Sequence, residues 1–427
     1  MTKAILLASA CFVALSTQSA DAERIRITGG NVIDVTSGEI TAADIIIEDE
    51  RIVAIGSARE TRAEATDRTI DMDGAYILPG LSDSHVHLTS RADVHGYRRL
   101  TVSSQAAAIS GVVHAGTTLR AGFTSVRNLG GPAFADVALR DAINSGEIEG
   151  PRMLVAGPSI GITGGHCDNN LLPHEYDVTS GGVANGPWGV RTKVRESIKY
   201  GATVIKFCGT GGVLSKGTKI GAQQFTQEEM DAIVDEAHLL GVKVAVHAHG
   251  TDGIRTALNA GVDSVEHASL IDDDGIAQAI EQGTYLSMDV YVSDFILSEG
   301  EAAGILEESL EKERTVGRAQ RERFKAAVEA GANIAYGTDA GVYTHGLNGR
   351  QFAYMVEWGM TELQAIQAAT IGNATLFGLE ADTGSLTVGK YADIIAVDGN
   401  PLEDISELES VDFVMKGGVV YVGQGAN

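Results

Sequence analysis

The sequence predicts an α/β protein in which a (β/α)8 TIM barrel carries a small β-sandwich domain built from both ends of the chain. Its 427 residues suit a barrel of about 250 residues or more with an accessory unit. The central part repeats a helical stretch, a glycine and a short apolar strand, whereas both ends carry short β-type runs separated by turn residues. These three observations define the expected architecture.

The two ends of the chain have the pattern of antiparallel β structure. Short β-branched runs start at Ile25 and recur at 44–47 and 52–55, and the same texture returns at 392–397 and 411–422. We therefore expect residues 23–78 and 380–427 to pair into the β-sandwich domain, with the barrel formed by residues 79–379.

The central segment has the period of a parallel α/β repeat. Its clearest helix follows Thr226, where Thr-Gln-Glu-Glu is a capping box, and is expected to run to Leu240. Strands are expected near Ile77, Val126, Leu154, Ile205, Val244, Val265, Leu286 and Ile334. Strand–helix alternation implies a parallel sheet, and eight units with right-handed crossovers close into a barrel.

The net charge and the N-terminal segment limit the expected binding partners and the expected cellular compartment. A formal net charge of −25 disfavours nucleic acid and anionic membranes as partners, because both require a basic face. Lys3, the apolar stretch 4–15 and the Ala20-Asp21-Ala22 step predict a signal peptide over residues 1–22, too short for a membrane span. The protein is therefore expected to be periplasmic or secreted.

Two cysteines, Cys167 and Cys208, remain after removal of that segment. A disulfide between them is permitted in an oxidising compartment, but spacing cannot establish it. Two free buried thiols are the expectation.

Five segments end an apolar run on a residue type that binds metal ions. In chain order these positions are His85 with His87, Lys206, His247, His267 and Asp339. The C-terminal ends of parallel barrel strands meet at one face, so these side chains are expected to converge there. The pattern favours a hydrolase with two metal ions. The alternatives are paired or core histidines that bond only to the protein.

Lys206 is the residue whose charge needs an explanation. A buried ammonium beside divalent cations would be disfavoured by desolvation and by like charge. A neutral amine that takes up carbon dioxide becomes a carbamate, an anion able to bridge two ions about 3.5–4 Å apart. A lysine paired with a carboxylate and a Schiff-base lysine remain open alternatives.

Several motifs together resemble the amidohydrolase superfamily. Within it the chain is similar to the imidazolonepropionase-like branch, which contains metal-dependent Xaa-Pro dipeptidases, related carboxypeptidases and ochratoxin-hydrolysing amidases. The motifs span nearly the whole chain after the predicted signal: 79–88, 122–127, 163–166, 247–250, 337–341 and 389–393. One departure is Asn128, where many relatives have aspartate, which weakens a supporting carboxylate role at that position.

The resemblance implies a ligand set and a mechanism. His85, His87, Lys206 and Asp339 would surround one ion, and carbamylated Lys206 with His247 and His267 the other. Zinc is the common metal of the family. The ions would lower the pKa of water from 15.7 toward about 7, and Asp339 would take the water proton and return it to the leaving nitrogen.

Further residues are candidates for contact with the substrate. His166 follows the third strand as a donor to a carbonyl or carboxylate group, and is also assigned a catalytic role. Tyr291 and His345 lie beyond the seventh and eighth strands, and His249 shares a strand face with His247.

The sequence thus predicts an exported metallohydrolase that cleaves a small-molecule amide or dipeptide and releases its C-terminal amino acid. Ochratoxin-type amides fall within this class, and a homo-oligomer is expected from the resemblance. The alternatives are a cyclic-amide hydrolase of the imidazolonepropionase type and a non-catalytic, metal-stabilised binding protein.

Overall fold

The computed structural model describes residues 24–64 and 67–426. The predicted signal peptide, residues 1–22, lies outside the described residues. Within the described ranges, no helix combines the length and the apolar character needed to cross a membrane.

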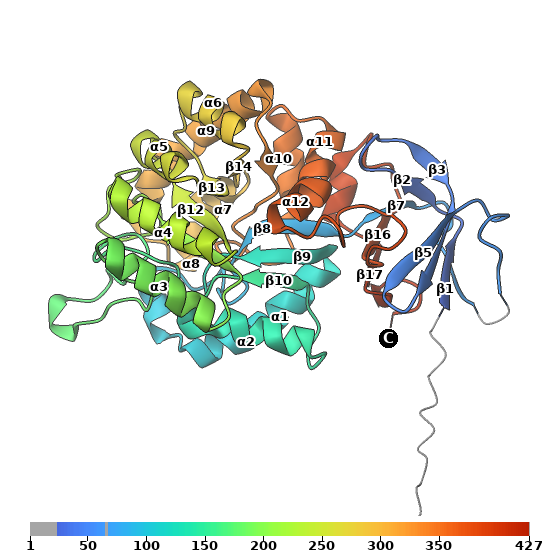
Figure 1. The fold of residues 1–427 in the computed structure, drawn as a ribbon, viewed down its shortest axis with the longest axis horizontal. Coiled ribbons are helices and arrows are strands. Elements are labelled where there is room, and N and C mark those ends of the chain that lie inside the picture. Colours follow the sequence, from blue (N-terminus) through green and yellow to red (C-terminus); the bar gives the residue numbers. More distant parts are fainter. Residues whose placement is uncertain (1–23, 65–66, 427) are drawn as a thin grey trace, which may run out of the picture.

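Two sheets form a β region at one end of the molecule, on the right in Figure 1. One has the order β5-β4-β1-β6 and the other the order β18-β17-β16-β7-β2-β3. Their strands are β1 (Arg24–Thr28), β2 (Asn31–Ile33), β3 (Ile40–Ala42), β4 (Asp44–Glu48), β5 (Arg51–Gly56), β6 (Arg68–Asp71), β7 (Tyr76–Pro79), β16 (Ile394–Val397), β17 (Phe413–Lys416) and β18 (Val419–Val422).

The two ends of the chain meet in the larger of these sheets. β7 pairs with β16 in antiparallel register, with Ile77 opposite Ala396. Side chains of both sheets share one apolar cluster, which includes Ile25, Ile45 and Phe413. Alternate residues of β1 are buried because one face of this strand packs on that cluster.

The central strands are parallel and lie in two further sheets, β10-β9-β8 and β11-β12-β13-β14-β15. Isolated parallel bridges, Val86 with Ala340 and Ile160 with Phe207, connect the edges of these sheets. The strands are β8 (Leu81–Val86), β9 (Phe123–Asn128), β10 (Arg152–Val155), β11 (Val204–Cys208), β12 (Lys243–Ala248), β13 (Ser264–His267), β14 (Tyr285–Ser287) and β15 (Ile334–Ala335).

The first predicted strand requires a correction. Ile77 belongs to β7 of the antiparallel region, and the first central strand is β8, which begins at Leu81. Apolar residues stand on both sides of Pro79-Gly80, so hydrophobicity alone does not reveal the change of sheet. The chain passes from one sheet to the other at Gly80. Glycine is required there because a Cβ would lie 2.2 Å from the hydroxyl oxygen of Thr124.

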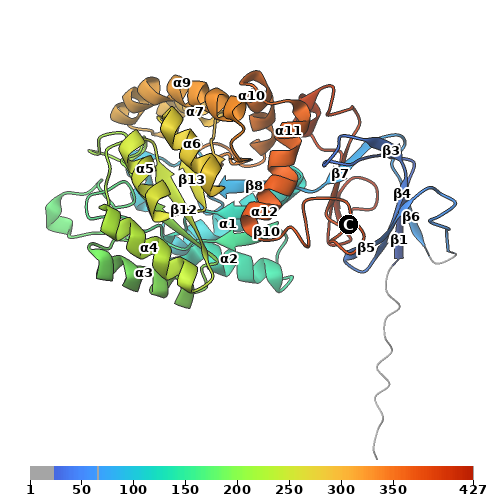
Figure 2. The same ribbon diagram turned by 45° about the horizontal axis from the view of Figure 1, so that its top comes forward.

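Helices surround the central strands, as Figures 1 and 2 show. They are α1 (Ser104–Arg120), α2 (Ala135–Asn144), α3 (Pro187–Lys199), α4 (Gln227–Leu239), α5 (Thr251–Ala260), α6 (Asp273–Gln282), α7 (Val292–Ser298), α8 (Gly300–Ala303), α9 (Glu307–Ala330), α10 (Gln351–Glu357), α11 (Glu362–Gln367) and α12 (Asn373–Phe377). The capping box at Thr226 is confirmed, with Glu229 as its partner. Gly331 ends α9 at φ 80°, a left-handed conformation that favours glycine.

Candidate active site

The predicted metal-ligand residues line one cavity of about 540 Å³. His85 lies on β8, Lys206 on β11, His247 on β12 and His267 on β13. The residues of these strands are almost all buried. Asp339 follows β15 in the chain. The structure therefore brings the six predicted positions together: His85, His87, Lys206, His247, His267 and Asp339.

One end of this cluster is formed by His85, His87 and Asp339. Their potential ligand atoms all lie within 4.8 Å of one another. The Oδ1 atom of Asp339 is 3.1 Å from Nε2 of His87 and 3.5 Å from Nε2 of His85. Two imidazoles and a carboxylate at these separations can hold a divalent cation.

The other end contains His247, His249 and His267, whose ring nitrogens also lie within 4.8 Å of one another. The rings of His247 and His267 are 4.5 Å apart, and those of His85 and His267 are 5.1 Å apart. The two ends are therefore adjacent parts of one constellation. His249 belongs to it as closely as His247 does, with its Nδ1 2.8 Å from the Ser269 hydroxyl.

Two cluster residues have a left-handed backbone that is uncommon for non-glycine residues. The φ angles are 69° at His267 and 58° at Asp339. The amide of Asp339 donates to the carbonyl oxygen of His85 at 2.8 Å, which fixes the turn. Strained residues of this kind cluster at functional sites, where the surrounding structure maintains them.

Lys206 is buried, and its Nζ atom has no hydrogen-bond partner among the described residues. Burial lowers the pKa of Lys206 to about 8, although Glu266 and Asp339 act in the opposite direction. Nε2 of His247 and Oδ1 of Asp339 are likewise buried without a hydrogen bond. Buried polar atoms normally find partners, so these three atoms fit a site that binds a further group.

Carboxylates lie behind two histidines of the cluster, and one of them, Asp289, forms a hydrogen bond with its histidine. Both oxygens of Asp289 are 3.0 Å from Nδ1 of His267, which leaves Nε2 for the cavity. Burial lowers the pKa of His267, but the charge of Asp289 and its hydrogen bond outweigh this and raise it. Glu266 accepts a hydrogen bond from Arg127 at 2.8 Å and lies 3.1 Å from Nδ1 of His85.

These supporting residues were not among the sequence predictions. Asp289 follows β14 and obeys the same strand-end rule as the predicted ligands, so the sequence did carry that signal. Glu266 and Arg127 carried no such signal, because their pairing spans 139 residues. Asn128 has a structural role: its Oδ1 accepts from the Leu88 amide at 2.7 Å.

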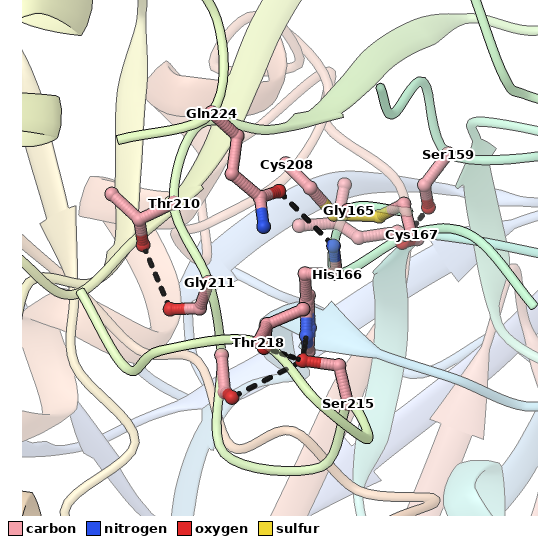
Figure 3. Close-up of a disulfide and its surroundings, with 12 residues drawn as sticks. Ser159, Gly165, His166, Cys167, Cys208, Thr210, Gly211, Ser215, Thr218 and Gln224 are labelled. Atoms are coloured by element: carbon pink, nitrogen blue, oxygen red, sulfur yellow. Dashed lines mark hydrogen bonds between the residues drawn. A yellow bond between two sulfur atoms is a disulfide. The ribbon is translucent and has the colours of Figure 1, made fainter. Parts of the chain in front are cut away.

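His166 reaches the cavity from the loop after β10. Its ring stacks on His247 with 4.0 Å between centroids, and its Nδ1 is 2.9 Å from the Ser215 hydroxyl. Its amide donates to Gln224 at 3.0 Å, as Figure 3 shows. Burial lowers the pKa of His166 to about 3, so the imidazole is neutral at pH 7.

A disulfide joins Cys167 to Cys208, so the expectation of two free thiols is not met. Their Cα atoms are 6.0 Å apart, within the usual range. The bond links the residue after His166 to β11, two positions beyond Lys206 (Figure 3). The two cysteines are 41 residues apart, and their proximity depends on the fold.

Two predicted substrate contacts are not brought to this cavity. The hydroxyl of Tyr291 accepts a hydrogen bond from Arg350 at 3.0 Å, and Tyr291 does not line the cavity. Nε2 of His345 is 3.0 Å from the Ser90 carbonyl, and its ring stacks on His114 at 4.2 Å. Both side chains are committed to contacts within the protein, which explains why position after a strand did not suffice to predict their role.

Comparison with known proteins agrees with this geometry. The Amidohydrolase family model matches residues 76–421. Ochratoxinase from Aspergillus niger is 34% identical over 435 aligned residues, which cover 95% of this chain and 88% of that protein. The solved structure of a Xaa-Pro dipeptidase with methionine in its active site has a TM-score of 0.89 and 40% identity, over 94% of this chain and all of that one (100%).

Two other solved structures are similar over nearly their full length. The A. niger ochratoxinase structure has a TM-score of 0.82 at 30% identity, covering 95% of this chain and 97% of that one. A prolidase complexed with N-methylphosphonate-L-proline has a TM-score of 0.86 at 30% identity, covering 94% and 100%. The family match and these likenesses, together with the cluster of metal-binding residue types, lead to one conclusion: the chain belongs to the amidohydrolase family and is a hydrolase that acts on amide bonds.

Proposed function

We propose that this protein hydrolyses the amide bond of a dipeptide or an N-acyl amino acid and releases the C-terminal amino acid, with the help of two divalent metal ions. The observation that carries the proposal is the convergence of five predicted ligands on the buried, unpartnered amine of Lys206. Such an arrangement would be unfavourable unless a further group compensates the buried atoms.

The residues fit two ions in the division that the family resemblance implies. His85, His87 and Asp339 would hold one ion, and His247 and His267 the other. Lys206, as a carbamate, would supply an oxygen to each. Nitrogen and oxygen ligands without thiolate suit zinc. When bound, such ions lower the pKa of water and offer positive charge to the oxygen of the carbonyl under attack.

The side chains of the chain itself then have defined tasks. Asp339 is the proton carrier: it accepts the proton of the attacking water and returns it to the nitrogen of the leaving amino acid. Asp289 fixes the ring orientation of His267 through its hydrogen bond to Nδ1, and Glu266 lies 3.1 Å from Nδ1 of His85. His166, whose Nδ1 is 2.9 Å from the Ser215 hydroxyl, would donate a hydrogen bond to the substrate.

The fold proposed for this chemistry is a closed (β/α)8 barrel with its active site at the C-terminal ends of the strands. The parallel bridges of Val86 with Ala340 and of Ile160 with Phe207 support closure at the two edges between the sheets. We retain the division into residues 23–78 with 380–427 and residues 79–379 as part of the proposal.

The compartment is a further part of the proposal. A periplasmic or secreted location is supported by the signal-like composition of residues 1–22 and by the Cys167–Cys208 disulfide, since disulfides persist in oxidising compartments. The expectation of a homo-oligomer rests on the family resemblance.

The substrate class follows from the relatives and is tested directly. One structural neighbour is a Xaa-Pro dipeptidase with bound methionine in its active site, and a sequence relative is an ochratoxinase. The experiment is a screen of dipeptides and N-acyl amino acids, ochratoxin-type amides included, with the zinc-loaded mature chain and detection of released amino acid. Release from at least one compound supports the proposal. Hydrolysis of cyclic amides alone would favour the imidazolonepropionase type, and metal binding without any turnover would favour a binding protein.

A further inference from the structure

The cavity contains a guanidinium group without a partner, that of Arg99 on the 3-10 helix η1 (Gly96–Thr101). Among the described residues, the side chain of Arg99 makes no hydrogen bond and no ion pair. Its side chain is exposed and lines the cavity, so the exposed surface faces at least in part the space available to a ligand.

The other cations that line the cavity are engaged or already assigned. Arg91 donates to Asp93 at 2.8 Å, and Lys216 donates to the hydroxyl of Tyr97 at 2.8 Å. The amine of Lys206 lies within the metal-ligand cluster. Arg99 is thus the cavity cation that has neither a partner nor a role in the cluster.

The carboxylates of the cavity are also engaged elsewhere. Asp168 accepts from the amides of Gly164 and Ser180 at 2.8 and 2.9 Å, and Glu313 accepts from the Ser293 hydroxyl. Asp289 holds His267, and Asp339 lies against His85 and His87. In a chain with 57 acidic and 32 basic residues, an arginine without a carboxylate partner leaves its positive charge available to a ligand.

Arg99 and His166 line the same cavity. Among the described residues, no carboxylate pairs with the guanidinium of Arg99. Burial lowers the pKa of His95, and the positive charge of Arg99 adds to that shift. The His166 ring stacks on His247, so this cavity joins the side that Arg99 lines to the metal-ligand cluster.

We propose that Arg99 binds the α-carboxylate of the C-terminal amino acid, so that a free carboxylate is a requirement for efficient substrates. The inference rests on the proposed function and deepens it. The α-carboxylate of a leaving amino acid is separated from the scissile nitrogen by one carbon, so its binding group belongs close to the cluster. Arginine supplies positive charge as well as hydrogen bonds, and it matches a carboxylate in a bidentate geometry.

The test compares a carboxylate with its neutral isostere. The probes are N-benzoyl-L-phenylalanine and N-benzoyl-L-phenylalaninamide, used with the zinc-loaded mature protein. The variants are Arg99→Gln, Arg99→Lys and the matched control Arg91→Gln, which removes a cavity arginine that is already paired with Asp93. Both kcat/KM and the equilibrium dissociation constant from calorimetry are measured.

For the native chain we expect the carboxylate probe to be preferred in both measurements. Arg99→Gln should weaken binding and kcat/KM for the carboxylate probe by roughly 10- to 100-fold and change the amide probe by less than about 3-fold. Arg99→Lys should recover part of the loss, and Arg91→Gln should behave as the native chain.

Two results would overturn the assignment: equal losses on both probes in Arg99→Gln, or no preference of the native chain for the carboxylate in binding. Absence of turnover with normal, Arg99-dependent binding of the carboxylate probe would count against the proposed function and in favour of the carboxylate site. Turnover that does not depend on Arg99 would support the proposed function and count against the carboxylate site. The two failures are therefore distinguishable.

Discussion

The two sides of the cavity are built in different ways. The side with the proposed metal ligands comes from buried strands and the residues that directly follow them, such as His85 on β8 and His247 on β12. The side proposed to bind the substrate comes from connecting segments, with Arg99 on η1 and His166 in the loop after β10. Strand ends hold reacting groups in a fixed frame, whereas the connections vary independently of the frame. Chemistry and substrate choice can therefore be disturbed separately.

The largest effect is expected from Lys206→Ala. Removal of the amine removes the group that would bridge the ions, so both metal content and amide hydrolysis should be lost. Elemental analysis of the purified variant checks this against the native chain. Lys206→Arg serves as the control that keeps a cation but cannot form a carbamate, and it should fail in the same way. Two ions per chain in Lys206→Ala would show that the bridging role is wrong.

Asp339→Asn should separate proton transfer from metal binding. The substitution keeps the size of the side chain and one oxygen, so the fold and most of the metal content should persist, while kcat falls by roughly 10²–10⁴-fold because the proton carrier is gone. Steady-state kinetics with elemental analysis on the same sample provides the measurement. Turnover within a few-fold of the native rate would assign the proton transfer to another group.

Asp289→Asn should have an intermediate effect, because it acts through His267. Loss of the negative charge behind Nδ1 should reduce metal affinity or activity by roughly 10–100-fold. Competition with a zinc chelator measures the affinity. Asp263→Asn is the matched control: Asp263 lies 2.8 Å from Nε2 of His238, does not line the cavity and should leave zinc affinity unchanged. Equal losses in both variants would contradict an orienting role for Asp289.

On the substrate side, the paired change Cys167→Ser with Cys208→Ser should loosen the segment that carries His166. Opening this cross-link should lower the free energy of unfolding by about 2–4 kcal/mol. His166 keeps its bonds to Gln224 and Ser215, so kcat/KM should fall by no more than about 10-fold, with metal content unchanged. Denaturant unfolding with and without a reducing agent measures the difference. Two titratable thiols in the unreduced, unfolded mature chain would contradict the disulfide.

The same division explains what the sequence could predict. An apolar run that ends on histidine, lysine or aspartate is a local pattern, so the convergence of His85 to Asp339 on one cavity could be predicted without coordinates. No local pattern identifies Arg99, because its proposed role depends on the absence of an ion-pair or hydrogen-bond partner for its side chain among the described residues. The Cys167–Cys208 bond and the engagement of Tyr291 with Arg350 depend on contacts across 41 and 59 residues. Such contacts follow from the packing of the connections, which no local period encodes.

The smallest effect concerns stability at the cavity wall, where Glu313 is buried on α9 beside Ser293. Burial raises the pKa of Glu313 to about 7 from its ordinary 4.5, despite the hydrogen bond from Ser293. The folded chain therefore binds this proton more tightly than the unfolded chain. Stability from this group is fully present below about pH 4.5 and is lost as the pH rises toward 7.

Glu313→Gln should remove the loss of folding stability that the native chain shows as the pH rises toward 7. The variant should match the native chain at pH 4 and exceed it above pH 7 by on the order of 1–3 kcal/mol in the free energy of unfolding. Denaturant unfolding at a series of pH values tests this, with Glu329→Gln, an exposed position on the same helix, as the control. A native chain whose stability does not fall relative to Glu313→Gln between pH 4.5 and 7 would mean that water or a bound ion solvates this carboxylate. The cavity wall near α9 would then be accessible to solvent or to ions.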